Sequence, residues 1–380
     1  MPQFLKGMTA VRGGTDVPAE AGRDDIRPPV ILLVDWDASR RAPWLADELR
    51  GLGFPVKVVG IGNYDMRNRQ RRWRKPMLWW QYLRLAWRGV QEARRDSAVI
   101  LSWNFIPGAF ASALCQAPRL RSIGVVSLNL IAFDKNVAHG LLRRLVYAVA
   151  TARGNFWATV SSPELRLSYM TQFRFDARHL VVLRDSWAPE YPVVPADCAP
   201  SKGYVFSGGE AARDWPTLLA AAKMTPTLAF RVIARRMQWH GDWEIPPNVV
   251  VQFDTTEDEF YAAAGNSDFL ALPLDDSATA GLIVLLRASL LGKAIVCSET
   301  NATRAYVPDA LSYLLVPPHD ASALASACER LASDTSDRSR AATLLQGHIL
   351  RRFSPEDYAE HVGDLLVAAS GSAPTTTAGT

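Results

Sequence analysis

The sequence has little cysteine and no long apolar run, and both absences narrow the class of protein. Its four cysteines are scattered over 380 residues without the short spacings of zinc ligands or a disulfide framework. They therefore predict buried thiols in a reducing compartment: Cys115, Cys198, Cys297 and Cys328. The first residues, MPQFLKGMTAVRGG, lack the continuous apolar core of a secretory signal. We expect a cytoplasmic protein.

The sequence also lacks a stretch that suits a membrane-spanning helix. The longest uncharged candidate, 98–118, contains Asn104 and the pair Pro107-Gly108, which suit a turn between a strand and a helix. With 48% apolar residues, 21% charged residues and a net charge of +4, the composition is that of a globular protein. The net charge is too small to indicate a partner by itself.

One pattern is repeated in the two halves of the chain. Short, continuous runs of β-branched and apolar residues alternate with longer segments of helical composition, and such runs are typical of parallel strands covered on both faces. Six runs in each half predict an α/β protein with two Rossmann-like, doubly wound domains that face a cleft. The runs begin near residues 30, 56, 98, 123, 156 and 179, and near 203, 228, 248, 268, 293 and 312. Two helical stretches, 320–332 and 354–369, follow the last run.

A proline-rich segment, SWAPEYPVVPADCAPSK, separates the two halves. Proline fixes the backbone φ angle and removes a hydrogen-bond donor, so we expect a stiff connector. The polar ends have too little apolar content to offset the entropy lost on ordering. The expected division is a disordered N-terminus at 1–27, an N-terminal domain at 28–188, a hinge at 189–202, a C-terminal domain at 203–350, a C-terminal helix at 351–369 and a disordered tail at 370–380.

A glycine-containing turn near the start of the second half has the composition of a phosphate site. Gly208 and Gly209 end an apolar run, and Arg213 precedes a segment that begins with proline and then reads TLLAAAK. Glycine lets the backbone approach a ligand closely, and arginine offers a planar, charge-assisted fork to a phosphate. An ordinary turn with a surface arginine would contain the same residues.

A second turn precedes the helical segment LIVLLRASLLG. Small and hydroxylated residues stand there at a predicted helix N-terminus, where unpaired N–H groups and the helix dipole favour anions: Ser277, Thr279, Ala280 and Gly281. Arg287 lies about two turns after Thr279, near the same face of the helix. It could equally be a solvated helix charge.

With these two motifs, the stretch 203–332 resembles the donor-binding domain of retaining GT-B glycosyltransferases of family four. YVFSGG followed by RDWPTLLAAA is similar to that family's glycine-rich segment, and SATAGLIVLLRASLLGKAIVCSE is similar to its signature segment. The resemblance implies a glycosyltransferase that uses a nucleotide diphosphate sugar as co-substrate, with no other cofactor and no protein-bound metal. It also implies that the C-terminal helix returns to the N-terminal domain. The N-terminal half of the chain matches the family only in layout.

Three positions depart from the family pattern. Thr279 stands where the family usually has a first Glu, and Glu210 stands where an Arg often is. Arg287 replaces a second Glu, which resembles a ribose-hydroxyl acceptor in the family; because arginine has only donors, ribose recognition must be rebuilt or weakened. The diphosphate charge would be neutralised by Arg213 and helix N-termini, beside Gly208, Gly209, Thr279, Ala280 and Gly281.

The segment 129–135 follows the fourth run of the first half, near the family's acceptor-side loop. Asp134 is the best polar candidate for catalysis there, with His139 behind it. Either residue could equally be a loop charge.

The residues from 66 to 96 combine many arginines with tryptophans and contain almost no acid before Glu92. Cations beside aromatics are typical of a segment that lies on an anionic membrane. The residues expected to face a membrane or an acceptor are Arg71, Arg72, Arg74, Trp79 and Trp80. Arginine and tryptophan also suit single-stranded nucleic acid, but no other segment resembles a nucleic-acid module, so we expect no nucleic-acid partner. The simplest alternative is a helix with inward tryptophans and solvated arginines.

The leading interpretation is an enzyme that moves a sugar from a nucleotide donor to a lipid-linked or cell-envelope glycan acceptor, with peripheral contact to the inner face of the cytoplasmic membrane. A soluble small molecule is the second candidate acceptor. The third interpretation is a pseudo-glycosyltransferase that binds a partner without turnover, and it depends on the departures at Arg287 and Glu210.

Overall fold

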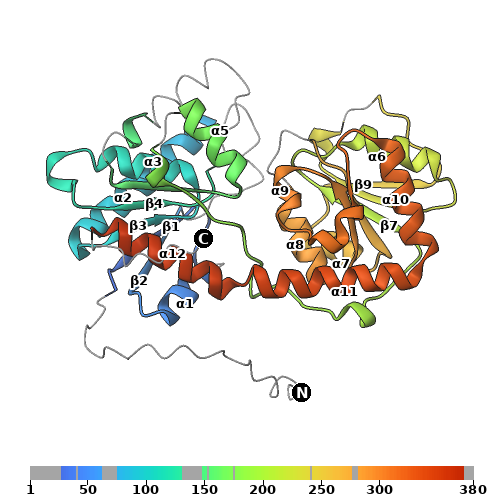
Figure 1. Cartoon of the computed structure of the whole chain (residues 1–380). Helices are drawn as coiled ribbons and strands as arrows, with labels where there is room; N and C mark the ends of the chain where they lie inside the picture. Colours follow the sequence, from blue (N-terminus) through green and yellow to red (C-terminus); the bar gives the residue numbers. More distant parts are fainter. Residues whose placement is uncertain are drawn as a thin grey trace, which may run out of the picture.

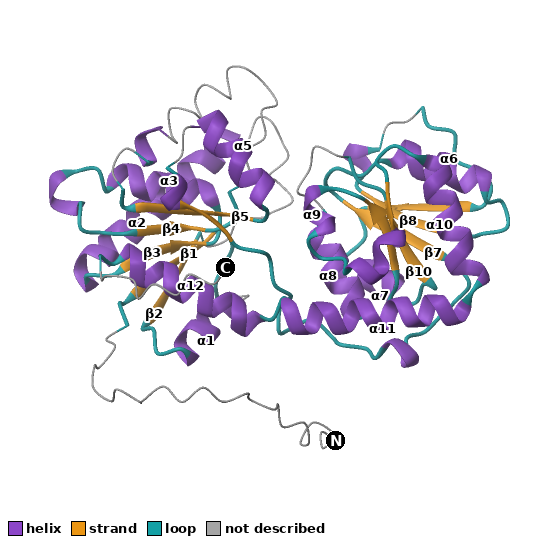
Figure 2. Ribbon diagram, in the orientation of Figure 1, coloured by secondary structure: helices purple, strands orange, loops and turns teal. Residues whose placement is uncertain are grey.

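The computed structural model describes residues 27–39, 42–61, 75–130, 148–151, 154–173, 176–239, 242–275 and 281–371. These residues form two α/β domains that lie side by side (Figure 1). Each domain has a six-stranded parallel sheet between layers of helices (Figure 2). We call the part with the first sheet the N-domain and the part with the second sheet the C-domain.

The N-domain sheet has the strand order β2-β1-β3-β4-β5-β6. All five residues of β1 are buried, as a parallel strand with helices on both faces requires. Its register aligns Val30 with Val56 of β2 and with Val99 of β3. The strands are β1 (Val30–Val34), β2 (Val56–Gly60), β3 (Val99–Ser102), β4 (Val125–Ser127), β5 (Phe156–Val160) and β6 (Leu180–Val182).

Two hydrophobic clusters cover the two faces of this sheet. One packs α2 (Lys75–Asp96) and α3 (Phe105–Leu114) on the first face through residues such as Leu85 and Ala109. The other packs α1 (Trp44–Gly51) and α12 (Pro355–Ala369) on the second face through residues such as Leu49 and Val362. A further helix, α5 (Pro163–Phe173), lies beside β5 and β6. The last helix of the described chain therefore belongs to the core of the N-domain.

The C-domain sheet has the strand order β12-β11-β10-β7-β8-β9. Its strands are β7 (Val205–Gly209), β8 (Phe230–Ala234), β9 (Val249–Phe253), β10 (Phe269–Leu272), β11 (Ile295–Ser298) and β12 (Leu315–Val316). Its helices are α6 (Trp215–Met224), α7 (Glu257–Gly265), α8 (Leu282–Leu290), α9 (Asn301–Arg304), α10 (Ala321–Ser333) and α11 (Thr335–Arg352). All twelve strands coincide with the apolar runs, which confirms the predicted fold class.

Local signals set the helix ends in the C-domain. Asp214 caps α6 by accepting a hydrogen bond from the Thr217 N–H at 3.1 Å, and a proline occupies the first turn. Gly281 precedes α8 with a φ of 94°, and Gly292 follows it with a φ of 70°. Both angles are in the left-handed region that glycine adopts without strain.

The chain crosses between the domains twice. The first crossing follows β6, and the proline-rich connector then packs against the C-domain, because the Val194 N–H donates to the Leu290 carbonyl at 2.8 Å. Gln346 of α11 also donates to the Val194 carbonyl, at 2.7 Å. The second crossing joins α11 to α12 along the lower edge of the molecule (Figure 1).

Two features differ from the sequence predictions, and one agrees. Helix α11 was not predicted. Cys198 is exposed in the short turn Ala196–Cys198 of the connector, so the prediction of four buried thiols is wrong for this residue. The stretch 98–118 forms β3 and α3, as predicted. Within the described ranges, every helix is too short or too polar to cross a membrane. The predicted disordered ends fall almost entirely outside these ranges.

Candidate functional site

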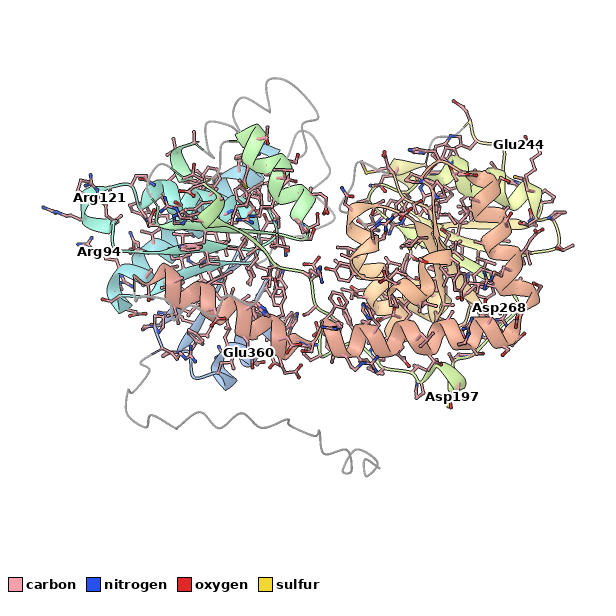
Figure 3. The ribbon with its side chains drawn as sticks, in the orientation of Figure 1. Arg94, Arg121, Asp197, Glu244, Asp268 and Glu360 are labelled. Atoms are coloured by element: carbon pink, nitrogen blue, oxygen red, sulfur yellow. The ribbon has the colours of Figure 1, made fainter. Side chains whose placement is uncertain are left out.

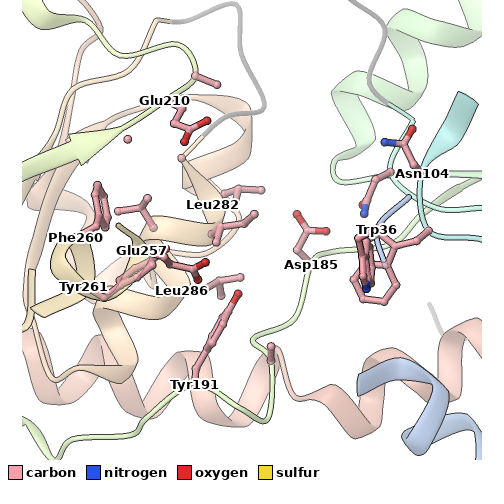
Figure 4. A pocket seen from close by; sticks show the side chains of 18 of the residues that line it. Trp36, Asn104, Asp185, Tyr191, Glu210, Glu257, Phe260, Tyr261, Leu282 and Leu286 are labelled. Atoms are coloured by element: carbon pink, nitrogen blue, oxygen red, sulfur yellow. The ribbon is translucent and has the colours of Figure 1, made fainter. Parts of the chain in front are cut away.

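A cleft of about 1450 Å³ lies between the two domains. Residues that follow β1, β3 and β4 line it on the N-domain side, and residues that follow β7, β8 and β9 line it on the C-domain side. Ligands of doubly wound sheets bind beyond the carboxyl ends of the strands, and both sheets direct those ends at this cleft. The close view in Figure 4 shows side chains from both walls facing the same space.

The turn that follows Gly208 and Gly209, the last residues of β7, is held together by Arg213. Its Nε donates to the Gly208 carbonyl and its Nη1 to the Ala211 carbonyl, both at 2.8 Å. Burial lowers the pKa of Arg213 to about 10, so the guanidinium remains charged at neutral pH. These bonds use two of its five N–H donors. Gly209 and Arg213 both line the cleft, so the structure places a positive charge beside the turn.

The N-terminus of α8 lies on the same wall, where Gly281, Leu282 and Ile283 line the cleft. The first N–H groups of a helix have no partner within the helix and favour an anion. The other residues predicted for this turn lie outside the described residues: Ser277, Thr279 and Ala280.

Arg287 is not a solvated helix charge. Its Nη1 pairs with Glu257 Oε1 at 2.5 Å, and its side chain is only 12% exposed. The guanidinium carbon lies 3.5 Å from the ring centroid of Tyr261 and 4.6 Å from that of Tyr191. Glu257 lines the cleft, whereas Arg287 lies behind it.

Glu210 forms an ion pair with Arg235, the residue after β8. The guanidinium of Arg235 also lies 3.8 Å from Asp254, the residue after β9. All three side chains line the cleft. Acidic groups therefore offset the charge of Arg235 in this structure, whereas Arg213 is held by backbone carbonyls.

The N-domain wall contains a buried carboxylate that sequence reasoning did not select. Asp35 follows β1 directly and accepts hydrogen bonds from Asn104 Nδ2 at 3.2 Å and from the Tyr82 hydroxyl at 3.3 Å. Asn104 also caps α3 by accepting from the Ile106 N–H. The sequence feature that could have identified Asp35 is its position directly after a continuous apolar run, because that end of a strand faces the ligand in this fold class.

Asp185 lies in the middle of the cleft, on the first crossing between the domains (Figure 4). Its backbone N–H donates to the Tyr306 hydroxyl at 2.7 Å. Its carboxylate has no hydrogen-bond partner among the described residues, and burial raises its pKa to about 6. A carboxylate that is costly to bury and faces a cleft is a candidate functional group. The predicted catalytic candidates, Asp134 and His139, lie outside the described residues.

Helix α2 presents an apolar and basic face to the solvent. Met77, Trp80 and Trp87 are 61%, 65% and 51% exposed, and they recur at helical spacing. Trp79 instead packs edge-on against Phe110, with ring centroids 5.6 Å apart, so only part of the predicted tryptophan surface faces outward. Arg94, at the end of α2, lies on the side of the N-domain away from the C-domain (Figure 3). Arg71, Arg72 and Arg74 lie outside the described residues.

The fold is shared with solved glycosyltransferase structures. A sucrose-phosphate synthase from Thermosynechococcus elongatus superposes with a TM-score of 0.67 at 14% identity, covering 91% of this chain and 100% of that one. A glycosyltransferase from Rickettsia africae gives 0.66 at 11% identity, with 91% and 100% covered. Anabaena HepE, solved with UDP and glucose, gives 0.61 at 14% identity, with 90% and 100% covered.

This chain has the GT-B fold. No model of a known protein family matches the sequence, and no curated protein matches it either. At these identities the likeness establishes the arrangement of two sheets about a cleft. Over the residues that the structure describes, no group of three or more His, Cys, Asp or Glu side chains has the geometry to hold a metal ion.

Proposed function

We propose that the protein is a glycosyltransferase that moves a sugar from a nucleotide diphosphate sugar to a membrane-associated acceptor, either a lipid-linked glycan or a cell-envelope glycan. The observation that carries this proposal is the interdomain cleft of a GT-B fold, with Gly209, Arg213 and the N-terminus of α8 on one wall. HepE, which has the same fold, was solved with UDP-glucose. A nucleotide sugar is the ligand class that suits such a cleft.

The C-domain wall supplies what the leaving group needs. During transfer the bond between the sugar and the diphosphate breaks, and the negative charge stays on the diphosphate. A fixed cation and the unpaired N–H groups of a helix stabilise that charge without rearranging. Arg213 suits this role because two backbone carbonyls hold its guanidinium in place at the cleft.

The exposed face of α2 supports the membrane-associated acceptor. Met77, Trp80, Arg84 and Trp87 recur every three or four residues, so they share one face of the helix. Tryptophan with nearby arginine is favoured at an anionic lipid surface. The predicted retaining stereochemistry rests on the sequence resemblance alone.

Release of nucleoside diphosphate tests the catalytic part of the proposal. A panel of UDP, GDP and ADP sugars is incubated with the protein and a lipid extract, and the released diphosphate is measured. We expect release from at least one donor. Tight donor binding without any release, with or without lipid, would instead indicate a non-catalytic scaffold. The pairing of Arg235 with two acids favours that alternative, because it offsets a positive charge that a leaving diphosphate would need.

Flotation with liposomes tests the acceptor side. We expect the protein to float with vesicles that contain anionic lipid and to be released as salt rises, because the attraction is screened over roughly 8 Å at physiological ionic strength. Trp80→Ser with Trp87→Ser should remove most of this binding. The matched control is Met237→Ser, which changes an apolar side chain of the C-domain that is 70% exposed. Absence of salt-sensitive flotation of the wild-type protein would favour a soluble acceptor. Equal flotation of all three proteins would show that the exposed face of α2 does not attach the protein to the vesicles.

A further inference from the structure

The cleft contains a carboxylate with an unusually rigid support. Glu257 is the first residue of α7, which begins there because Thr256 and Glu259 form a capping box. Its side chain is 61% exposed and lines the cleft. Figure 4 shows it on the C-domain wall beside Tyr261 and Leu286, directed towards the space between the domains.

Arg287 fixes this carboxylate from behind. The two tyrosine rings that flank the guanidinium belong to different elements, because Tyr261 lies on α7 and Tyr191 on the connector. Arginine between aromatic faces gains cation–π attraction and loses rotamer freedom. Its Nη1 contacts Oε1 of Glu257, and Oε2 accepts no hydrogen bond from any described residue. The support therefore leaves one carboxylate oxygen directed at the cleft.

The chemistry of such a group is to accept hydrogen bonds from hydroxyls. A carboxylate has about four lone-pair positions, so it can bind both hydroxyls of a vicinal diol while it keeps its arginine partner. In doubly wound nucleotide-binding folds, an acidic residue near the crevice binds ribose in this way. Glu257 lies on the same wall as Gly209 and Arg213, so a diphosphate at that turn would bring its ribose to this wall.

We propose that Glu257 accepts hydrogen bonds from the ribose hydroxyls of the donor and that Arg287 is its positioning residue. This inference rests on the proposed function. It also accounts for an arginine at position 287. The arginine cannot accept hydrogen bonds itself, but it holds a carboxylate from the neighbouring helix within 2.5 Å of its own Nη1. Ribose recognition is therefore rebuilt from α7.

Calorimetry with two probes tests the proposal. The tightest binder among UDP, GDP and ADP is compared with its 2′,3′-dideoxy counterpart, which lacks both hydroxyls. We expect wild-type protein to prefer the ribose form by at least about tenfold, since a hydrogen bond to a charged group contributes about 1.5–3 kcal/mol. Glu257→Gln and Glu257→Ala should remove most of this preference, with little change in the affinity for the dideoxy form.

The control is Asp258→Asn, which neutralises the next carboxylate along α7 and should keep the full preference. The preference is a ratio measured on one protein sample, so partial unfolding of a variant cancels. If Glu257→Gln and Glu257→Ala leave the ratio of the two affinities unchanged, the ribose role is wrong. The ion pair with Arg287 would then serve only to hold α7 against α8. If wild-type protein binds no nucleoside diphosphate, the proposed function itself fails.

Discussion

Asp185→Asn should stabilise the protein above pH 6 and leave its stability nearly unchanged near pH 4. Burial raises the pKa of Asp185 from the ordinary value of 3.8 to about 6. The folded protein therefore binds this proton more tightly than the unfolded chain does. The ionised carboxylate costs free energy in the folded state, and asparagine of nearly the same shape removes that cost.

The size of the effect follows from the shift. The pKa rises by about two units, and each unit corresponds to about 1.4 kcal/mol, which gives a ceiling of about 3 kcal/mol. Because Asp185 lines the cleft and is only half-buried, we expect about 1–3 kcal/mol. The cost is absent below pH 3.8, where the side chain is protonated in both states. It grows between pH 3.8 and 6 and is fully present above pH 6.

Urea unfolding of both proteins at pH 4, 6 and 8, followed by circular dichroism, measures this difference directly. The control is Glu360→Gln, which neutralises an exposed carboxylate on α12 (Figure 3) and should show no such trend. A difference between wild type and Asp185→Asn that is the same at all three pH values would refute the reasoning. So would a variant that is less stable than wild type at pH 8.

Three further predictions concern the C-domain. Arg213→Ala should weaken nucleoside diphosphate binding by about 1.5–3 kcal/mol and leave nucleoside binding nearly unchanged; equal losses in calorimetry would mean that Arg213 only shapes its turn. Phe206→Ala, at a fully buried site in β7, should cost about 3–5 kcal/mol of unfolding free energy in urea, and a loss below 1 kcal/mol would contradict the packing. Gly292→Ala should lower the free energy of unfolding by at least about 1 kcal/mol, because φ is 70° and a methyl group would meet the Val194 carbonyl at 2.8 Å. Unchanged stability in urea would contradict the close packing of the connector against this turn.

The sheets could be predicted from the sequence because each strand is a continuous apolar run. All residues of β1, β3 and β7 are buried, so their composition alone identifies them. Helix α11 could not be predicted in the same way. Its buried apolar residues, such as Leu345 and Ile349, are spread among arginines and polar side chains, and only the tertiary contacts show which face packs inward.

The candidate site could be predicted only where it is local in the sequence. Gly208 and Gly209 end β7 and Arg213 follows four residues later, so their proximity is readable from the chain. Glu257 and Arg287 are thirty residues apart and meet only because α7 and α8 pack together. Asp185 could not be selected, because nothing in its sequence shows that the first crossing between the domains passes through the cleft.

The measurement that tests the central claim most directly is thermal unfolding of the wild-type protein in the presence of UDP, GDP or ADP, with the matching nucleosides as controls. A ligand that binds only the folded state stabilises it, by about 2.7 kcal/mol at a concentration one hundred times its Kd. We predict that at least one nucleoside diphosphate raises the melting temperature in a concentration-dependent way and that its nucleoside has a much smaller effect. No shift with any nucleoside diphosphate at millimolar concentration would contradict the account.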